Sequence, residues 1–211
     1  MINEDLFGNA IETNITNYED GLSVYREALT LSQQQSLVKV IKTRIKDFQT
    51  QSLPSGTLMH IKTQSWGKWQ WVSDAKGMRY EPLENVPIPD DFLRIAAKYA
   101  PEMTPESVVV NLYKPNGGLG FHCDRQEPNQ DAPILTVSLG LPARFTWANS
   151  YTTAPSKSIT LQSGDIVKMA GQARRAYHKV EVSGKSEKSA LLTKLGLEKP
   201  VRLSITIRQV C

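Results

Sequence analysis

The chain has 211 residues, of which 40% are hydrophobic and 22% are charged, and its formal net charge at pH 7 is +4. It is long enough for one globular domain with a sizeable core, and no apolar run approaches the roughly 18–20 residues that a membrane-spanning helix needs. The slight positive charge is compatible with nucleic-acid binding but indicates it only weakly.

The N-terminal residues, MINEDLFGNAIETN, contain neither a basic n-region nor an apolar h-region, so we expect no secretory signal peptide. The two cysteines, Cys123 and Cys211, do not make a disulfide framework. We therefore expect a reducing compartment, the cytoplasm. No segment reads as a helix for self-association, so a monomer is the expected state.

Two helices are predicted in the N-terminal half. In residues 29–49 apolar side chains recur at spacings of three or four, which predicts one helix with Ser32 as its N-cap. Its apolar face comprises Leu37, Val40, Ile41, Ile45 and Phe48. Residues 88–100 predict a second helix, which Pro101 ends. Between the two, LMHIKTQ and WQWVS are strand-like and predict a hairpin around residues 57–82.

From residue 106 the pattern changes to short runs rich in Val, Ile, Thr and aromatic residues, which Gly, Pro, Asn and Asp separate. These runs are SVVVNLYK, APILTVSLG, ARFTWAN, SITLQ, DIVKMAG, YHKVEV and VRLSITIRQV. Their spacing predicts an all-β sandwich or barrel, so the whole chain is α+β but mostly β, with two helices packed on a β-core. The polar insert 184–199 is predicted to be a loop or a short helix.

A candidate metal site lies in the extended, Gly-flanked segment GGLGFHCDRQEP. Because side chains i and i+2 of a strand point to the same side, His122 and Asp124 can both reach one metal ion. With His178 from the run AYHKVEV they form the facial set of two imidazoles and one carboxylate that non-haem iron(II) oxygenases use. A lone H-x-D is usually not a ligand pair, and a single histidine is more often a satisfied core residue. Cys123, between two ligands, is expected to face away.

The last strand supplies an independent partner for this cluster. Polar and apolar residues alternate in it, so that one face carries Arg202, Ser204, Thr206 and Arg208. A solvated polar face is the ordinary interpretation. Two arginines also suit a dicarboxylate such as 2-oxoglutarate, because arginine makes bidentate, charge-assisted bonds to carboxylates. Asn111 and Tyr113 alternate in the same way in VVVNLYK and could bond the same oxygens.

A series of short motifs then connects these clusters along nearly the whole chain. They are DLF near the N-terminus, W-V-x-D-x-x-G-x-x-Y at Trp71–Tyr80, N-x-Y at Asn111, H-x-D at His122, E-P at Glu127, SLGLPARF at Ser138–Phe145, G-D at Gly164, R-x-x-x-H at Arg174 and R-x-S-x-T-x-R at Arg202–Arg208. Each motif is modest, but the ordered set resembles the AlkB family of dioxygenases, of the bacterial type.

The resemblance implies a double-stranded β-helix, or jelly roll, with flanking N-terminal helices and a nucleotide-recognition lid. In a single domain 1–211, residues 1–105 would supply the helices and lid hairpin, and residues 106–211 the catalytic core. The implied activity is oxidative demethylation of bases such as 1-methyladenine and 3-methylcytosine in DNA or RNA, with Fe(II), O2 and 2-oxoglutarate. His122, Asp124 and His178 would be the catalytic iron ligands. The implied 2-oxoglutarate site comprises Asn111, Tyr113, Arg202, Ser204, Thr206 and Arg208, with Arg208 at the iron-bound end and Arg202 at the distal carboxylate.

The implied substrate site must receive a base that has left the duplex or belongs to a single strand. Trp71 aligns with the stacking tryptophan of the family, and the ring of His122 would form the opposite wall. A core tryptophan, in a run that also holds Trp66 and Trp69, is the alternative. Further implied contacts, to the nucleic-acid backbone or around the base, involve Arg79, Tyr80 and Arg174. For Arg174, a salt bridge at the protein surface is an equally good interpretation.

Three substrate positions depart from the family pattern. Gln126 stands where an acidic residue is expected, Met78 where a tyrosine is expected, and Thr152 where an arginine is expected. At the cosubstrate, Ser204 replaces an asparagine. Because 1-methyladenine and 3-methylcytosine are cationic, an amide in place of a carboxylate weakens the preference for them. We therefore expect an altered preference among alkylated bases with turnover retained.

Two other functions fit the sequence. A 2-oxoglutarate-dependent oxygenase could act on a protein or small molecule, and it would release no formaldehyde from methylated nucleic acid. A catalytically silent nucleic-acid-binding module on the same scaffold would bind neither Fe(II) nor 2-oxoglutarate. The intact metal cluster and the two arginines argue against the silent module.

Overall fold

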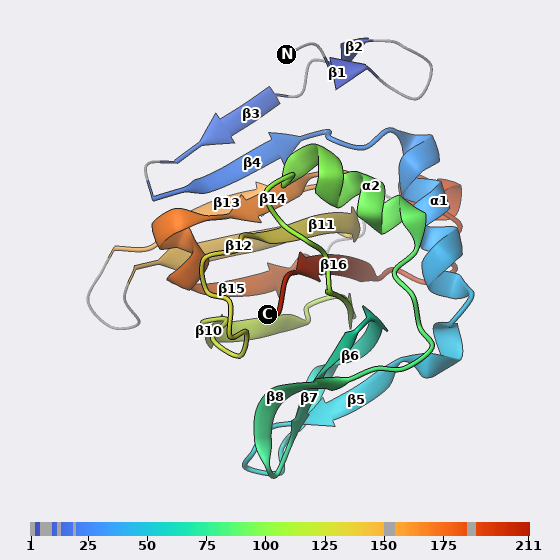
Figure 1. The fold of residues 1–211 in the computed structure, drawn as a ribbon. Helices are drawn as coiled ribbons and strands as arrows, with labels where there is room; N and C mark the ends of the chain where they lie inside the picture. The colour runs from blue at the N-terminus through green and yellow to red at the C-terminus, as the bar shows by residue number, and fades with distance from the viewer. Residues whose placement is uncertain (1–2, 5–9, 12–13, 19, 150–154, 185–188) are drawn as a thin grey trace.

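The computed structural model describes residues 3–4, 10–11, 14–18, 20–149, 155–184 and 189–211 (Figure 1). Its larger antiparallel sheet has the order β3 (Asn14–Asn17), β4 (Leu22–Arg26), β14 (Ile166–Met169), β11 (Ile134–Gly140), β16 (Arg202–Arg208), β9 (Ser107–Tyr113), β6 (Leu58–Gly67) and β5 (Gln49–Ser52). The smaller sheet has the order β10 (Gly118–His122), β15 (Tyr177–Val182), β12 (Ala143–Ala148) and β13 (Lys157–Leu161). Two antiparallel sheets in this jelly-roll-like arrangement confirm the predicted fold class.

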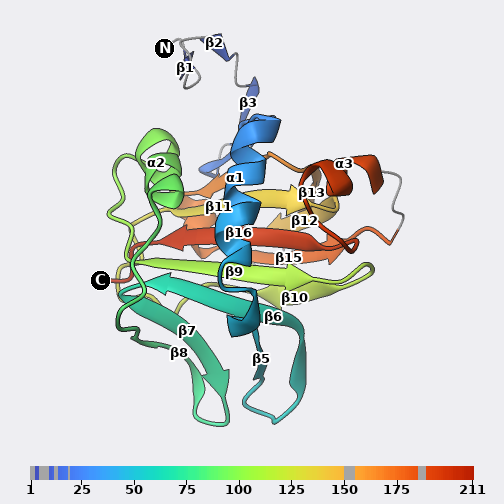
Figure 2. The ribbon, with the colours of Figure 1, turned by 90° about the vertical axis from the view of Figure 1, so that its right-hand side faces the viewer.

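The remaining elements lie around these sheets. They are the hairpin of β7 (Trp69–Asp74) and β8 (Gly77–Pro82), the pair β1 (Asn3–Glu4) and β2 (Ala10–Ile11), the helices α1 (Leu31–Lys42), α2 (Asp90–Tyr99) and α3 (Ser189–Lys194), and the 3-10 turns η1 (Ile45–Asp47) and η2 (Gly171–Arg175). Both α1 and α2 cover one face of the larger sheet, as Figure 2 shows for α1 crossing β16 and β9. No helix in the described ranges is long and apolar enough to cross a membrane.

The side chains of strand β16 alternate between two environments, one on each face of the larger sheet. Leu203, Ile205 and Ile207 are buried in one apolar cluster with residues of α1 and α2. The even-numbered residues of β16 point to the other side, where they line a cavity between the two sheets. A second apolar cluster fills the rest of that space with residues of both sheets, among them Val167 of β14 and Phe145 of β12. The period of two therefore places the polar face of β16 inside the molecule rather than in solvent.

The first predicted helix is shorter than the sequence pattern indicated. It begins after Thr30, not Ser32, and Thr30 forms a capping box with Gln33. It ends at Lys42, and the chain then turns through η1 into β5. Strand β6 bonds the chain just beyond Lys42, because Gln64 Nε2 donates to the carbonyl of Arg44 and Arg44 Nη1 donates to the carbonyl of Ser65 at 2.7 Å. These tertiary contacts outweigh the helical periodicity of residues 43–49.

Two other expectations about the N-terminal half need correction. The two strand-like runs do not form a hairpin with each other, because β6 pairs with β5 and β9 while β7 pairs with β8. The β-core does not start at residue 106 either, since β3, β4, β5 and β6 complete the larger sheet. Strand β10 was not predicted as an element. The second helix and the seven C-terminal strands are confirmed. The DLF motif and Thr152 lie outside the described residues.

Candidate active site

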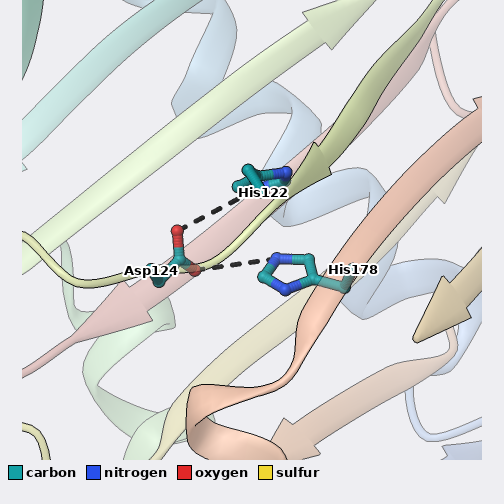
Figure 3. Close-up of side chains that lie close together, drawn as sticks. All are labelled: His122, Asp124 and His178. Carbon is teal, nitrogen blue, oxygen red and sulfur yellow. Dashed lines mark ion pairs between the residues drawn. The ribbon is translucent and has the colours of Figure 1, made fainter. Parts of the chain in front are cut away.

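Two histidines face each other on neighbouring strands of the smaller sheet. His122 ends β10 and pairs in register with His178 of β15, and their ring centroids are 4.2 Å apart. Asp124 follows β10, and its carboxylate faces both rings from one side (Figure 3). The Nε2 atoms of His122 and His178 are 3.9 Å and 3.8 Å from the carboxylate oxygens. These distances are too long for hydrogen bonds but let one metal ion contact all three side chains.

Backbone carbonyls fix the orientation of both rings. The Nδ1 atom of His122 lies 2.8 Å from the carbonyl of Gly120, and that of His178 lies 3.1 Å from the carbonyl of Ala176. A carbonyl only accepts hydrogen bonds, so Nδ1 carries the proton on each ring and Nε2 offers its lone pair towards the aspartate. Metal-bound histidines in proteins are commonly held in this way.

The protonation states of the cluster also suit a cation. Burial would raise the pKa of the Asp124 carboxyl, but the charge of Arg208 and the neighbouring imidazoles outweigh it and hold the pKa below its usual range. Burial, with His122 beside it, lowers the pKa of His178 to about 4. Near neutral pH the set therefore holds an ionised carboxylate and a neutral His178 imidazole, as metal ligation requires. The residues present fit an iron(II) ion.

The cavity between the two sheets begins at this cluster. It is lined by all six predicted cosubstrate residues, Asn111, Tyr113, Arg202, Ser204, Thr206 and Arg208. They come together because β16 pairs with β9, which sets Ser204 opposite Asn111 and Arg202 opposite Tyr113. The face predicted from the alternation in the sequence is thus turned inward, beside His122, Asp124 and His178.

The two arginines of this cavity have different partners. Arg208 Nη2 donates to Asp124 Oδ2 at 2.9 Å, and its Nη1 donates to Glu127. Arg202 donates only to neutral oxygens, Ser138 Oγ at 2.9 Å and the Leu141 carbonyl at 3.3 Å, and its Nε has no partner among the described residues. Burial lowers the pKa of Arg202 to about 10, so the side chain stays a cation at neutral pH. A buried cation without an acidic partner fits one carboxylate of 2-oxoglutarate.

A larger cavity of about 330 Å³ opens on the other side of the metal cluster. Trp71 and Met78 of the hairpin line one part of it, and His122 and Gln126 line another. Trp69 is not among its lining residues, and Trp66 is 3% exposed in the core. The structure therefore distinguishes Trp71 from the tryptophans near it in the sequence. Cys123 Sγ donates to the carbonyl of Arg175 at 3.1 Å and is not part of the metal cluster.

Glu127 is the site residue whose role the sequence did not indicate. Its side chain is 0% exposed, and it pairs with Arg174, itself 1% exposed, and with Arg208. Tyr80 of the hairpin donates to Glu127 Oε1 at 2.8 Å. A buried carboxylate thus connects β8 to the arginine that bonds Asp124. The E-P motif contained this residue, but nothing in the sequence located its partners.

Three residues predicted to contact the substrate are bonded to other side chains of the protein. Arg174 lies beneath the surface, where it donates to Glu127 and to the carbonyl of Asp124, and it does not line the large cavity. The surface salt bridge that served as its alternative is wrong, because the ion pair of Arg174 with Glu127 is buried. The hydroxyl of Tyr80 is bonded to Glu127. Arg79 pairs with Asp74 and Glu81 within the hairpin.

The Glu127 contacts give a prediction about stability. Glu127→Gln removes the charge between two buried guanidinium groups, so we expect the free energy of unfolding to fall by about 1–3 kcal/mol. Glu181→Gln is the matched control, because Glu181 forms an ion pair with Lys179 but is 53% exposed. The control should lose less than about 1 kcal/mol. Urea unfolding measures both, and equal losses would contradict the buried network.

Comparisons with known proteins agree with this geometry. The family described as the 2OG-Fe(II) oxygenase superfamily matches residues 21–208. An alpha-ketoglutarate-dependent dioxygenase AlkB homolog of Caulobacter vibrioides is 32% identical over 172 residues, which cover 76% of this chain and 77% of the relative. A DNA N(6)-methyladenine demethylase of Arabidopsis thaliana is 32% identical over 114 residues, 52% of this chain and 25% of the relative.

Two more matches extend the comparison. A tRNA demethylase of Schizosaccharomyces pombe is 28% identical over 106 residues, which cover 47% of this chain and 35% of the relative. The solved structure of OsALKBH1 superposes with a TM-score of 0.81 at 20% identity, over 92% of this chain and 99% of that one. At that identity the superposition shows a shared fold.

Proposed function

Because this chain belongs to the 2OG-Fe(II) oxygenase superfamily, and within it to the AlkB-type dioxygenases, we propose that it oxidatively demethylates N-alkylated bases in nucleic acid. Relatives are named as demethylases of DNA and of tRNA. The single observation that carries the proposal is the shared wall of the two cavities. His122 and Asp124 line both the cavity with Trp71 and the cavity with Arg202.

The residues divide the work of the reaction. When bound, iron(II) with O2 and 2-oxoglutarate would supply an oxidation in which the N-methyl carbon leaves as formaldehyde and 2-oxoglutarate becomes succinate and CO2. The ring nitrogen of a neutral base takes up a proton in place of the methyl group, whereas a cationic base loses its positive charge and takes up none. His122, Asp124 and His178 hold the metal, and Arg208 orients the Asp124 carboxylate through its 2.9 Å bond. Arg202 would hold one carboxylate of the cosubstrate. The cavity places the methyl group at the metal and keeps water away.

A base can enter such a cavity only from a single strand or after flipping out of a duplex. The base is proposed to bind between the ring of Trp71 and that of His122, both of which line the cavity. We propose that the enzyme acts as a monomer. Both cysteines are free, which suits a reducing compartment such as the cytoplasm.

The experiment that tests the function is a demethylation assay on single-stranded DNA and RNA that carry one methylated base. Purified protein with Fe(II) and 2-oxoglutarate should release formaldehyde and the unmodified oligonucleotide, and omission of either cofactor should stop the release. If 2-oxoglutarate is consumed without any change in methylated nucleic acid, the substrate is instead a protein or small molecule.

The tryptophan assignment gives a further prediction. Trp71→Ala should raise KM for a methylated oligonucleotide by roughly 5- to 150-fold, because stacking on an aromatic side chain contributes about 1–3 kcal/mol per base. Trp71→Phe should retain much of the affinity. Trp69→Ala is the control, since Trp69 lies on the same strand but outside the cavity. Steady-state kinetics with varied oligonucleotide distinguishes the three variants. A larger effect of Trp69→Ala would reverse the assignment.

A further inference from the structure

The cavity proposed to receive the base contains very little negative charge. Among the described residues that line it, Asp124 is the one acid, and it is already bonded to Arg208 and belongs to the metal cluster. Many of the other lining residues are apolar, namely Leu53, Met59, Ile61, Trp71, Met78, Val109, Leu119 and Phe121. A bound base would therefore meet no carboxylate that is free to pair with a positive ring.

The nearest additional acid is turned away from the cavity. Glu127 directly follows Gln126 in the chain, yet it does not line the cavity and its side chain is 0% exposed. Its carboxylate accepts from Tyr80, Arg174 and Arg208, so two guanidinium groups neutralise it. The four buried charges, from Asp124, Glu127, Arg174 and Arg208, sum to zero before any metal binds. This end of the cavity therefore offers no net negative charge to a cationic base.

Gln126 contributes a neutral amide to the wall of this cavity. Asn111, the other amide of the wall, also lines the cosubstrate cavity, whereas Gln126 lines this one alone. Gln126 lines the cavity two residues after Asp124. A carboxylate only accepts hydrogen bonds, whereas the amide of glutamine also donates two. An amide can therefore bond a keto oxygen on the base, which an ionised carboxylate would repel. The charge and the hydrogen-bonding capacity of the cavity point to the same class of base.

We propose that this cavity selects methylated bases that are neutral and carry a keto oxygen beside the methylated nitrogen, with Gln126 as the specificity-determining residue. Examples are 3-methylthymine and 1-methylguanine. Their cationic counterparts, 3-methylcytosine and 1-methyladenine, carry an amino group at the same ring position and are the poorer substrates. The inference rests on the proposed function and deepens it, because it names which N-methylated bases the site takes.

The experiment uses matched pairs of single-stranded oligonucleotides that differ only in the lesion. One pair carries 3-methylthymine or 3-methylcytosine, and the other carries 1-methylguanine or 1-methyladenine. The expected result for the wild-type enzyme is a higher kcat/KM for the keto member of each pair. Gln126→Glu, which exchanges an amide for a carboxylate of the same shape, should shift the ratio towards the cationic member on the order of tenfold or more.

Gln172→Glu is the matched control, because it adds the same charge at an exposed position outside the cavity. It should leave both ratios unchanged. Faster repair of the cationic bases by the wild-type enzyme overturns the inference and leaves the proposed function intact. If the wild-type enzyme prefers the keto bases and Gln126→Glu leaves that preference unchanged, Gln126 does not determine the specificity. Absence of demethylation on all four oligonucleotides, with the metal and cosubstrate bound, refutes the proposed function itself.

Discussion

His178→Ala is expected to reduce demethylation to the background of the assay. The side chain supplies one of the three atoms that can hold the metal, and its Nδ1 bond to Ala176 aims its Nε2 at the cluster. A facial triad with one ligand missing leaves the metal on a histidine and a carboxylate, and the affinity for iron(II) should fall with it. Turnover and iron content should therefore be lost together.

The measurement pairs formaldehyde release with the iron content of the purified variant. His60→Ala is the matched control, because His60 is the chain's remaining histidine and lies exposed on β6. Urea unfolding of both variants separates loss of the metal from loss of the fold. A His178→Ala enzyme that keeps its iron and its turnover would exclude this cluster as the metal site.

Arg202→Met is expected to raise KM for 2-oxoglutarate steeply without destabilising the cosubstrate-free protein. Loss of a buried, hydrogen-bonded charge partner costs about 2–5 kcal/mol of binding, which corresponds to roughly 30- to 5,000-fold. Before the cosubstrate binds, however, Arg202 is a buried cation whose described partners are the neutral oxygens of Ser138 and Leu141. Removing such a charge relieves its desolvation cost, so the variant should unfold at an equal or higher urea concentration.

The opposite signs of these two effects make the test specific. A purely structural arginine would lose stability and affinity together. Arg144→Met is the matched control, since Arg144 is exposed on β12 and bonds only Ser158 among the described residues. Titration of 2-oxoglutarate gives the affinity, and urea unfolding without cosubstrate gives the stability. An unchanged KM would mean that the distal carboxylate binds elsewhere.

The two arginines of β16 also explain how the site is organised before any ligand binds. Arg208 is already engaged by Asp124 and Glu127, and burial, which would lower its pKa, is outweighed by these two acids, which hold it well above its usual value. Arg202 bonds the neutral oxygens of Ser138 and Leu141 and forms no ion pair among the described residues. One arginine thus bonds Asp124 of the candidate metal cluster, and the other lines the cavity without an acidic partner, as the proposed binding of a carboxylate requires. Arg202 and Arg208 lie on the same face of one strand, but their surroundings differ.

Much of this site could be read from local pattern. Alternation in VRLSITIRQV placed the four polar side chains of β16 on one face, because a period of two is a property of the extended backbone itself. The two-residue spacing of His122 and Asp124 likewise placed both on one side. The C-terminal strands were predicted for the same reason, since each is identified by its own composition. These features depend on neighbours in the chain.

What the sequence left open depends on contacts between distant residues. Trp69 and Trp71 share a face of β7 by periodicity, and only the position of the hairpin beside β5, β6 and β9 selects Trp71 for the cavity. Gln126 and Glu127 are adjacent, yet Arg174, Arg208 and Tyr80 draw the second inward and leave the first at the surface of the cavity. By itself the sequence determined the mostly β fold, the polar face of β16 and the three residues of the candidate metal cluster. Only the tertiary structure decided which charges are neutralised, because that depends on partners from other strands.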